Sequence, residues 1–383
     1  MYLVDADGHV EESETTFSDK YFDPAFRAQR PRVVAIDKMV YWMIEEQMYP
    51  RRVGRGAHNL GTPASYHGKK TPHAQKKSDT IGSMEIHGVK ERIEAMDKEG
   101  ISLQVLYPTL FLAYPLAANP GLVTAMSSAY NRFLGDQIGA HERLKWAAVV
   151  NLDDVEGAVE QVREAHDLGA VAVMLLGTIG DRLLDDPAFL PFYEALVERD
   201  LTLAIHVGWA CPALSGLFTH IYPSSVNAFL MPVLLGFSSM INSGLLDRFP
   251  TLRVGFLEAG CQWVHFMIDR LDHRFGHSGN FLADILPDTV PKAKLAPMEY
   301  MRQGNLYLSA EVEDTLLPQV VELVGEGQVV YGSDMPHGDR EVLSSDYLRQ
   351  REDISDDIKT MILRDNGARL YNLDISDAVR KAS

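Results

Sequence analysis

The sequence predicts an α/β protein built as a (β/α)8 barrel, with residues 1–383 forming a single domain. Two observations lead to this prediction: short apolar runs recur along the chain, and segments with helical spacing of apolar residues separate them. Strands that are apolar throughout belong to parallel sheets covered by helices. Eight such units fit a closed barrel better than a doubly wound sheet, which usually carries a glycine-rich phosphate turn after its first strand.

The eight expected strands are compact apolar runs bounded by polar, Gly or Pro residues. They lie at residues 1–10, 101–110, 144–152, 170–178, 201–208, 252–260, 305–312 and 328–337. Between and after them lie amphipathic segments, several of which end on glycine, as helices often do. These expected helices lie at residues 88–100, 123–140, 155–169, 187–200, 263–275, 315–327 and 356–371.

One long stretch departs from the repeating unit. Residues 13–84 separate the first strand from its helix, and residues 51–77 within them are rich in Gly, His and Lys without helical or strand spacing. Because loops that follow strands build the active-site face of a barrel, we expect this insertion to cover the site. A disordered loop is the alternative for residues 51–80. Residues 209–231 and 277–297 are expected to help shape a pocket.

The composition narrows the classes of partner. A net charge of −17, with no basic run to offset it, opposes binding to nucleic acid or to anionic membranes, so small molecules are the expected partners. We expect no uncharged stretch long enough to span a bilayer, and hence a cytoplasmic protein. Cys211 and Cys261 are the only cysteines and lie far apart, so a bound metal would be held by His and carboxylate side chains.

Polar side chains interrupt the apolar runs at their carboxyl ends. They are Asp7 and His9 in the first strand, His206 in the fifth, Glu258 in the sixth and Asp334 in the eighth. In a barrel these ends meet at one mouth. Burying several unpaired charges costs several kcal/mol each unless a cation or hydrogen bonds compensate. The five residues therefore predict a divalent metal site.

The first strand supplies two of these ligands because side chains two positions apart project to the same side. Asp5 and Glu11 are expected to point away from the site. Zinc is the first expectation for an imidazole and carboxylate site, with manganese or iron as alternatives and one or two ions per chain.

Further residues are candidates for catalysis or for substrate contacts. His337, just beyond the eighth strand, could act in catalysis or lie on a loop surface. Glu12 could contact substrate or a ligand, and Arg51 could bind a substrate carboxylate. Trp209 and Tyr107 could form an aromatic wall, although aromatic residues at strand ends are equally often core residues.

The order and spacing of five motifs resemble the amidohydrolase superfamily, and within it the branch that includes aminocarboxymuconate semialdehyde decarboxylase and the resorcylate-type decarboxylases. The motifs are "DADGHVEE", "VLYPTL", "AIHVG", "EAGCQWVHFMIDRLD" and "VVYGSDMPHGD", and they span nearly the whole chain. The resemblance implies a metal-dependent enzyme on an eight-stranded barrel, assembled as a homo-oligomer, a dimer or a tetramer.

The resemblance also assigns residues. His9, His206 and Asp334 match metal ligands of the family. Asp7 stands where many members have the first histidine of an H-x-H pair, or a glutamate in the resorcylate-type enzymes. Glu258 stands where the decarboxylases carry a catalytic histidine, which puts decarboxylation by the usual route in doubt.

Four functions follow as hypotheses. The first is hydrolysis of a small carboxylate-bearing substrate by metal-activated water, with Glu258 or Asp334 moving protons. A non-oxidative decarboxylase is the second. The third is an oxygenase with two iron or manganese ions, because carboxylates in place of imidazoles favour such ions. The fourth is a barrel subunit without catalytic activity.

Overall fold

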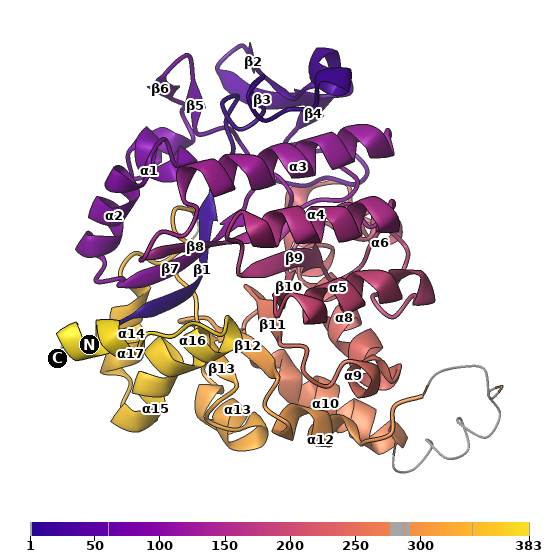
Figure 1. Cartoon of the computed structure of the whole chain (residues 1–383), viewed down its shortest axis with the longest axis vertical. Helices are drawn as coiled ribbons and strands as arrows, with labels where there is room; N and C mark the ends of the chain where they lie inside the picture. The colour runs from indigo at the N-terminus through magenta and orange to yellow at the C-terminus, as the bar shows by residue number, and fades with distance from the viewer. Residues whose placement is uncertain (1, 60, 276–286, 288–291, 339, 383) are drawn as a thin grey trace.

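A computed structural model describes residues 2–59, 61–275, 287, 292–338 and 340–382, and it confirms the predicted barrel (Figure 1). Eight strands form one sheet in chain order, with every neighbouring pair parallel. They are β1 (Val4–Val10), β7 (Leu103–Pro108), β8 (Leu144–Val149), β9 (Ala172–Leu176), β10 (Thr202–His206), β11 (Val254–Leu257), β12 (Leu306–Ala310) and β13 (Val329–Tyr331). The strands are buried throughout, apart from one partly exposed residue in β8, as their apolar sequences require.

The last strand returns to the first. The backbone N–H groups of Ser333 and Asp334, just beyond β13, both donate to the carbonyl oxygen of Asp7 in β1, at 3.1 and 2.8 Å. A side chain on Gly332 would also meet the Asp7 side chain, at 2.8 Å. The sheet is thereby closed next to a predicted metal ligand.

Helices cover the outside of the barrel (Figure 1). The main ones are α2 (Val89–Lys98), α3 (Pro120–Gln137), α4 (Val155–Asp167), α5 (Leu190–Glu198), α8 (Met231–Asn242), α10 (Trp263–His273), α13 (Leu317–Val324) and α16 (Asn366–Leu370). Shorter ones are α6 (Pro212–Ser215), α7 (Ile221–Asn227), α9 (Leu245–Arg248), α12 (Pro297–Arg302), α14 (Ser344–Gln350), α15 (Asp356–Thr360) and α17 (Ser376–Ala382). The expected helix over 356–371 is α15 and α16 joined by a π-helical turn, Met361–Asp365.

The insertion after β1 has more regular structure than its sequence predicts. It forms an antiparallel sheet of β2 (Arg32–Ile36), β3 (Met39–Ile44) and β4 (Gln47–Tyr49), then a hairpin of β5 (Ser65–Tyr66) and β6 (Lys69–Lys70), and then helix α1 (Ile81–Glu85). Both small sheets lie beyond the carboxyl end of β1, at the top of Figure 1. Of the other two irregular stretches, most of residues 277–297 lies outside the described residues.

The expectation that no stretch is long and apolar enough to span a bilayer is wrong. Residues Ile221–Asn242 meet that test by length and composition, which is weak evidence because half of the stretch is buried in the protein. The α8 part packs on the barrel, where a side chain on Gly177 would meet the carbonyl oxygen of Pro232 at 1.8 Å. Its apolar character therefore has a packing explanation.

Candidate metal centre

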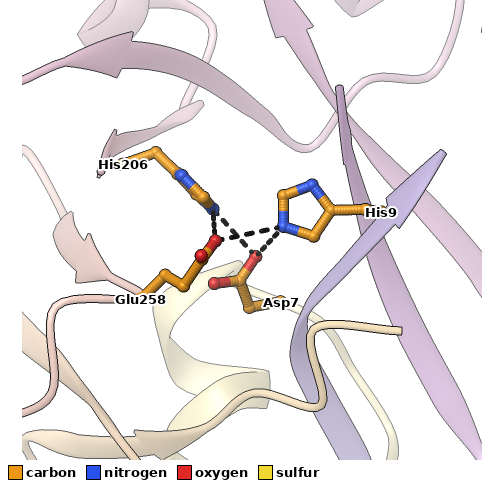
Figure 2. Close-up of side chains that lie close together, drawn as sticks. All are labelled: Asp7, His9, His206 and Glu258. Carbon is orange, nitrogen blue, oxygen red and sulfur yellow. Dashed lines mark hydrogen bonds and ion pairs between the residues drawn. The ribbon is translucent and has the colours of Figure 1, made fainter. Parts of the chain in front are cut away.

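The strand ends bring the five predicted ligands together at the mouth of the barrel. Ligating atoms of Asp7, His9, His206 and Glu258 lie within 4.8 Å of one another, and Figure 2 shows the four side chains pointing toward one point. His9, Glu258 and Asp334 form an overlapping group with His337. The ligand cluster is defined here as Asp7, His9, His206, Glu258 and Asp334.

His9 lies at the centre of the ligand cluster. Its Nε2 atom is 3.4 Å from Oδ1 of Asp7, 3.5 Å from Oε2 of Glu258 and 3.2 Å from Oδ1 of Asp334. Nε2 of His206 lies 3.3 Å from Oδ1 of Asp7 and 3.4 Å from Oε2 of Glu258. These atoms surround a common point at distances that a single cation could bridge.

Backbone carbonyls orient both imidazoles. Nδ1 of His9 donates to the carbonyl oxygen of Pro108 at 3.0 Å, and Nδ1 of His206 donates to that of Val207 at 3.1 Å. A carbonyl oxygen only accepts, so the proton of each neutral ring is held on Nδ1. The lone pair on Nε2 then faces the ligand cluster, which is how a second hydrogen bond commonly prepares a histidine to bind a metal.

Two of the carboxylates stand on strained backbone. Glu258 follows β11 with φ of 58°, and Asp334 follows β13 with φ of 53°. For residues other than glycine this left-handed conformation costs about 1–3 kcal/mol and persists only where the surroundings hold it. The N–H of Glu258 donates to Oγ of Ser309 at 2.7 Å, and the N–H of Asp334 to the Asp7 carbonyl. In this conformation both carboxylates point into the mouth of the barrel.

The buried charges perturb one another strongly. Burial raises the pKa of Asp7, but the imidazoles of His206 and His9 outweigh it and hold that pKa below its usual range. Burial and then the nearby Asp334 carboxylate raise the pKa of Glu258. Burial opposes charge on His9, but the surrounding carboxylates raise its pKa well above the ordinary value. The cluster is thus an excess of negative charge that attracts either protons or a cation.

The residues fit a divalent metal. Among the described residues, Nε2 of His9 and Oε2 of Glu258 are buried atoms without a hydrogen-bond partner, and both face the cluster. Such unsatisfied buried groups are costly unless a ligand completes them. Two imidazole nitrogens and several carboxylate oxygens form a donor set that suits zinc, manganese or iron.

His337 lies beside the ligand cluster. Its Nδ1 is 2.6 Å from Oδ1 of Asp334, its Nε2 is 2.9 Å from Oγ1 of Thr109, and its ring stacks on that of His9 with centroids 4.0 Å apart. It is therefore not on an exposed loop surface. Its predicted catalytic role remains a prediction.

A cavity of about 440 Å³ opens from the ligand cluster. Glu258 and His337 line one end of it. Its other walls are partly apolar, formed by Leu112, Trp209, Ile221 and Phe229, and partly polar, formed by Glu11, Asn59, Thr62, His73, Lys77, Thr109 and Ser225. Several of these residues come from the insertion after β1, so the insertion forms part of the cavity wall. The volume suits a small organic molecule.

The expected substrate contacts lie in different places. Trp209 lines the cavity, and its indole N–H donates to Oγ of Ser224 at 2.8 Å. Glu12 is buried and accepts hydrogen bonds from the backbone N–H groups of Thr109 and Leu110. Of the residues that line the cavity, none is Glu12, Tyr107 or Arg51.

Tyr107 and Arg51 have other partners. The hydroxyl of Tyr107 is 2.6 Å from that of Tyr371 inside the barrel, and the Tyr107 ring lies 5.5 Å from that of His206. Nη2 of Arg51 donates to the carbonyl oxygen of Gly56 at 3.1 Å, and Arg51 lines a separate hollow of about 590 Å³. In this arrangement neither side chain faces the cavity.

Two charged cavity residues were missed by the sequence reasoning. Lys77 forms a buried ion pair with Glu11, and both line the cavity, although Glu11 was expected to point away. Lys77 follows Lys76 and shares the insertion with Lys69 and Lys70, so the sequence carries no signal that singles it out. Asp5, also expected to point away, lies outside the ligand cluster but is fully buried.

Comparisons with known proteins agree with this geometry. The model of the amidohydrolase family matches residues 91–373. A 2-amino-3-carboxymuconate-6-semialdehyde decarboxylase from Dictyostelium discoideum is 23% identical over 288 residues, which cover 74% of this chain and 76% of that protein.

Solved structures share the fold. An amidohydrolase from Mycobacterium avium subsp. paratuberculosis is similar with a TM-score of 0.77 and 21% identity, over 98% of both chains. A 5-carboxyvanillate decarboxylase from Novosphingobium aromaticivorans, with bound manganese and 3-methoxy-4-hydroxy-5-nitrobenzoic acid, is similar with a TM-score of 0.65 and 20% identity, over 80% of this chain and 87% of that one.

Proposed function

Because this chain is an enzyme that belongs to the amidohydrolase family, we propose that it is a metal-dependent carboxy-lyase, which removes carbon dioxide from a small unsaturated or aromatic carboxylate. Hydrolysis is the first expectation from the sequence, but the relatives named as decarboxylases favour the second expectation, which is non-oxidative decarboxylation. The observation that carries the proposal is the ligand cluster, which opens into a partly aromatic cavity of about 440 Å³.

A divalent metal has a natural place in this proposal. Asp7, His9, His206 and Asp334 would hold it, and Glu258 would lie at its edge. When bound, the metal would act as a Lewis acid toward an oxygen of the substrate. Zinc stays the first expectation from the donor set, while the manganese in the similar decarboxylase structure makes manganese the first ion to test beside it.

The chemistry requires one proton. Breaking the bond between the carboxylate carbon and the substrate carbon leaves an electron pair on the substrate carbon, and a proton must be added there as carbon dioxide leaves. Glu258 is placed for this step, because its carboxyl group lies both in the ligand cluster and in the cavity wall. Burial raises its pKa, which favours the protonated form. Glu258 would thus take the part of the histidine found at this position in the resembling decarboxylases.

Other residues would shape the binding of substrate. Trp209, Phe229 and Leu112 offer one apolar wall to a flat substrate, and Lys77 offers a positive charge beside Glu11 on the polar side. His337 would hold the Asp334 carboxylate in place through its Nδ1 atom. Thr109 in turn holds the other nitrogen of His337.

The experiment compares two reactions on one preparation. Protein loaded with manganese or with zinc is given 5-carboxyvanillate and 2,6-dihydroxybenzoate, and carbon dioxide and the ring product are measured. A matched set of aryl amides and lactones tests hydrolysis. We expect release of carbon dioxide, and its loss when a chelator removes the metal. Hydrolysis products without carbon dioxide would reject the carboxy-lyase.

Two alternatives are separated by the same preparation. Hydrolysis is the second candidate, because the Glu258 carboxylate could take a proton from water as readily as a carboxylic acid gives one to carbon. An oxygenase would need two iron or manganese ions per chain and oxygen uptake. Elemental analysis that finds one ion per chain would count against it.

We also propose that the protein is a cytoplasmic homo-oligomer. Four exposed apolar side chains support the assembly into an oligomer. They are Val53, Leu217, Tyr222 and Val226, which are called the apolar patch. The two segments that carry the patch pair with each other through a bridge between Val53 and His220. Exposed apolar side chains carried on paired segments are candidates for a protein interface.

A further inference from the structure

A chain of buried hydrogen bonds lies beneath the ligand cluster and joins the elements that carry it. We define the support chain as Asp5 in β1, Gln104 in β7, Arg92 in α2 and Ser333 after β13. All four are buried. None of them belongs to the groups of side chains that could hold the metal.

Arg92 forms the centre of the support chain. Its guanidinium donates through Nε to Oε1 of Gln104 at 2.8 Å and through Nη2 to the carbonyl oxygen of Met335 at 2.7 Å. A third donor, Nη1, reaches the carbonyl oxygen of Ser83 at 3.3 Å. Burying a guanidinium is costly, so three separate acceptors around it indicate a built arrangement and not a chance contact.

The acceptor on Met335 is shared with a metal-binding strand. The backbone N–H of His9 donates to the same Met335 carbonyl at 2.6 Å. Met335 immediately follows Asp334, so one carbonyl joins the backbone of His9 to the turn that carries Asp334. Arg92 is a second donor to that same carbonyl.

The opposite end of the support chain holds the other neighbour of Asp334. Nε2 of Gln104 donates to Oδ2 of Asp5 at 2.6 Å, and Asp5 accepts hydrogen bonds from both the N–H and the Oγ of Ser333, at 2.9 and 2.5 Å. The residues on both sides of Asp334 are therefore fixed. This matters because Asp334 stands in the strained left-handed conformation.

Gly8 makes room for the support chain. A side chain on Gly8 would lie 2.4 Å from Nε2 of Gln104. The glycine between the two ligands of β1 thus lets Gln104 lie against the strand and reach Asp5. The close approach of Gln104 therefore explains why the position within "DADGHVEE" is a glycine, without any need for a turn.

We propose that Arg92 is a positioning residue for the metal centre: through the Met335 carbonyl and the Gln104–Asp5–Ser333 link it sets the separation between His9 and Asp334. The inference rests on the proposed metal site and goes beyond it, since Arg92 touches neither metal nor substrate. Residues that hold ligands in place typically change metal affinity by about 10–100-fold when removed.

The test measures metal binding without reference to any substrate. The manganese dissociation constants of wild type, Arg92→Met and Arg92→Lys are obtained by competition with a chelating indicator, and the electron paramagnetic resonance spectrum of the bound ion is recorded. We expect Arg92→Met to bind about 10–100-fold more weakly with an altered spectrum. Arg92→Lys should recover only part of the affinity, because an ammonium cannot reproduce the three-way fork.

Arg143→Met is the matched control. Arg143 also donates to backbone carbonyls, those of Ile101 and Ser102, but at the amino end of β7, away from the ligands. We expect this variant to lose thermal stability while its manganese affinity and spectrum stay those of wild type. That contrast separates positioning from a general loss of stability.

The outcomes are distinguishable. If wild type binds no divalent metal, the proposed function fails. If wild type binds manganese and folded Arg92→Met binds it equally well with the same spectrum, the positioning role is rejected while the function stands. Should Arg92→Met not fold, Ser333→Ala decides, because it removes the hydroxyl that donates to Asp5 and accepts from the backbone N–H of Met335. Affinity weakened about fivefold or more supports the proposal, and unchanged affinity overturns it.

Discussion

At the scale of single residues, the side chains of the ligand cluster could be predicted because their chemistry contrasts with that of their neighbours. Asp7, His206 and Glu258 interrupt apolar runs at points that a barrel brings together. The backbone conformation of two of the cluster residues could not be predicted in this way. Glu258 and Asp334 adopt positive φ without being glycine, and no local signal in the sequence predicts this.

The carboxyl group of Glu258 offers a direct test at this scale. We expect Glu258→Gln to lower kcat by about 10²–10⁴-fold, because an amide cannot supply the proton that decarboxylation requires. Metal content, measured by elemental analysis, should stay near that of wild type. Glu313→Gln is the control, since Glu313 is an exposed carboxylate in a neighbouring hollow. Equal kcat for wild type and Glu258→Gln would rule out this role.

His58 predicts a dependence of stability on pH. Burial, and then the nearby Arg51 charge, lower the pKa of His58 to about 4, whereas the unfolded chain has a value near 6.5. Between these values the unfolded state binds more protons, so stability is fully present above about pH 6.5 and is lost as the pH falls toward 4. The loss should reach about 3 kcal/mol.

The variant His58→Gln isolates this contribution because glutamine does not titrate. Urea unfolding of both proteins from pH 7.5 down to pH 4.5 is the measurement. As the pH falls from 7.5 to 4.5, we expect wild type to lose more unfolding free energy than the variant. A difference that stays constant with pH would contradict the assignment.

At the scale of elements, apolar runs located the strands because a parallel strand in a barrel is buried on both faces. The sheet of the insertion was missed for a different reason. The turn between β3 and β4 is made by Glu45 and Glu46, both with positive φ, where glycine or asparagine is the usual signal. The pairing of β1 with β7 also shifts between Asp5 and Gly8, which breaks the strict alternation that would place Asp5 on the same side as Asp7 and His9.

The close approach of α8 to the end of β9 is tested by Gly177→Ala. The added carbon would lie 1.8 Å from the carbonyl oxygen of Pro232 and 2.5 Å from the backbone nitrogen of Val233, and neither atom can move without shifting the helix. We expect a loss of about 1–3 kcal/mol or more in unfolding free energy. Gly327→Ala is the control, since its nearest atom would be a flexible arginine end at 3.4 Å. Equal stability of the two variants would refute the packing argument.

At the scale of the whole molecule, the barrel and its place in the amidohydrolase family followed from the order of motifs, because that order fixes which strand ends meet. The residues that line the cavity could not all be predicted in this way. Lys77 and Glu11 meet only because the insertion folds back over the mouth, and a contact between a loop and a strand leaves no periodic trace in either.

The apolar patch predicts assembly. We expect wild type to sediment as a dimer or tetramer, and Tyr222→Glu to shift the equilibrium toward the monomer. The Tyr222 side chain is 80% exposed, so a charge there costs the monomer little free energy. At an interface the same charge would be buried, which destabilises the oligomer. Analytical ultracentrifugation measures this. Tyr347→Glu on α14 is the control, with a side chain that is 52% exposed. A wild type that sediments as a monomer would exclude the interface.

The closure of the barrel at Asp7 has a consequence for the order in which the protein is made. Asp7 is synthesised well before the turn with Asp334, whose backbone N–H donates to the Asp7 carbonyl oxygen. A growing chain can therefore hold at most part of the ligand set until the final strand arrives. Binding of a metal by the whole ligand cluster would therefore have to follow the docking of β13 against β1.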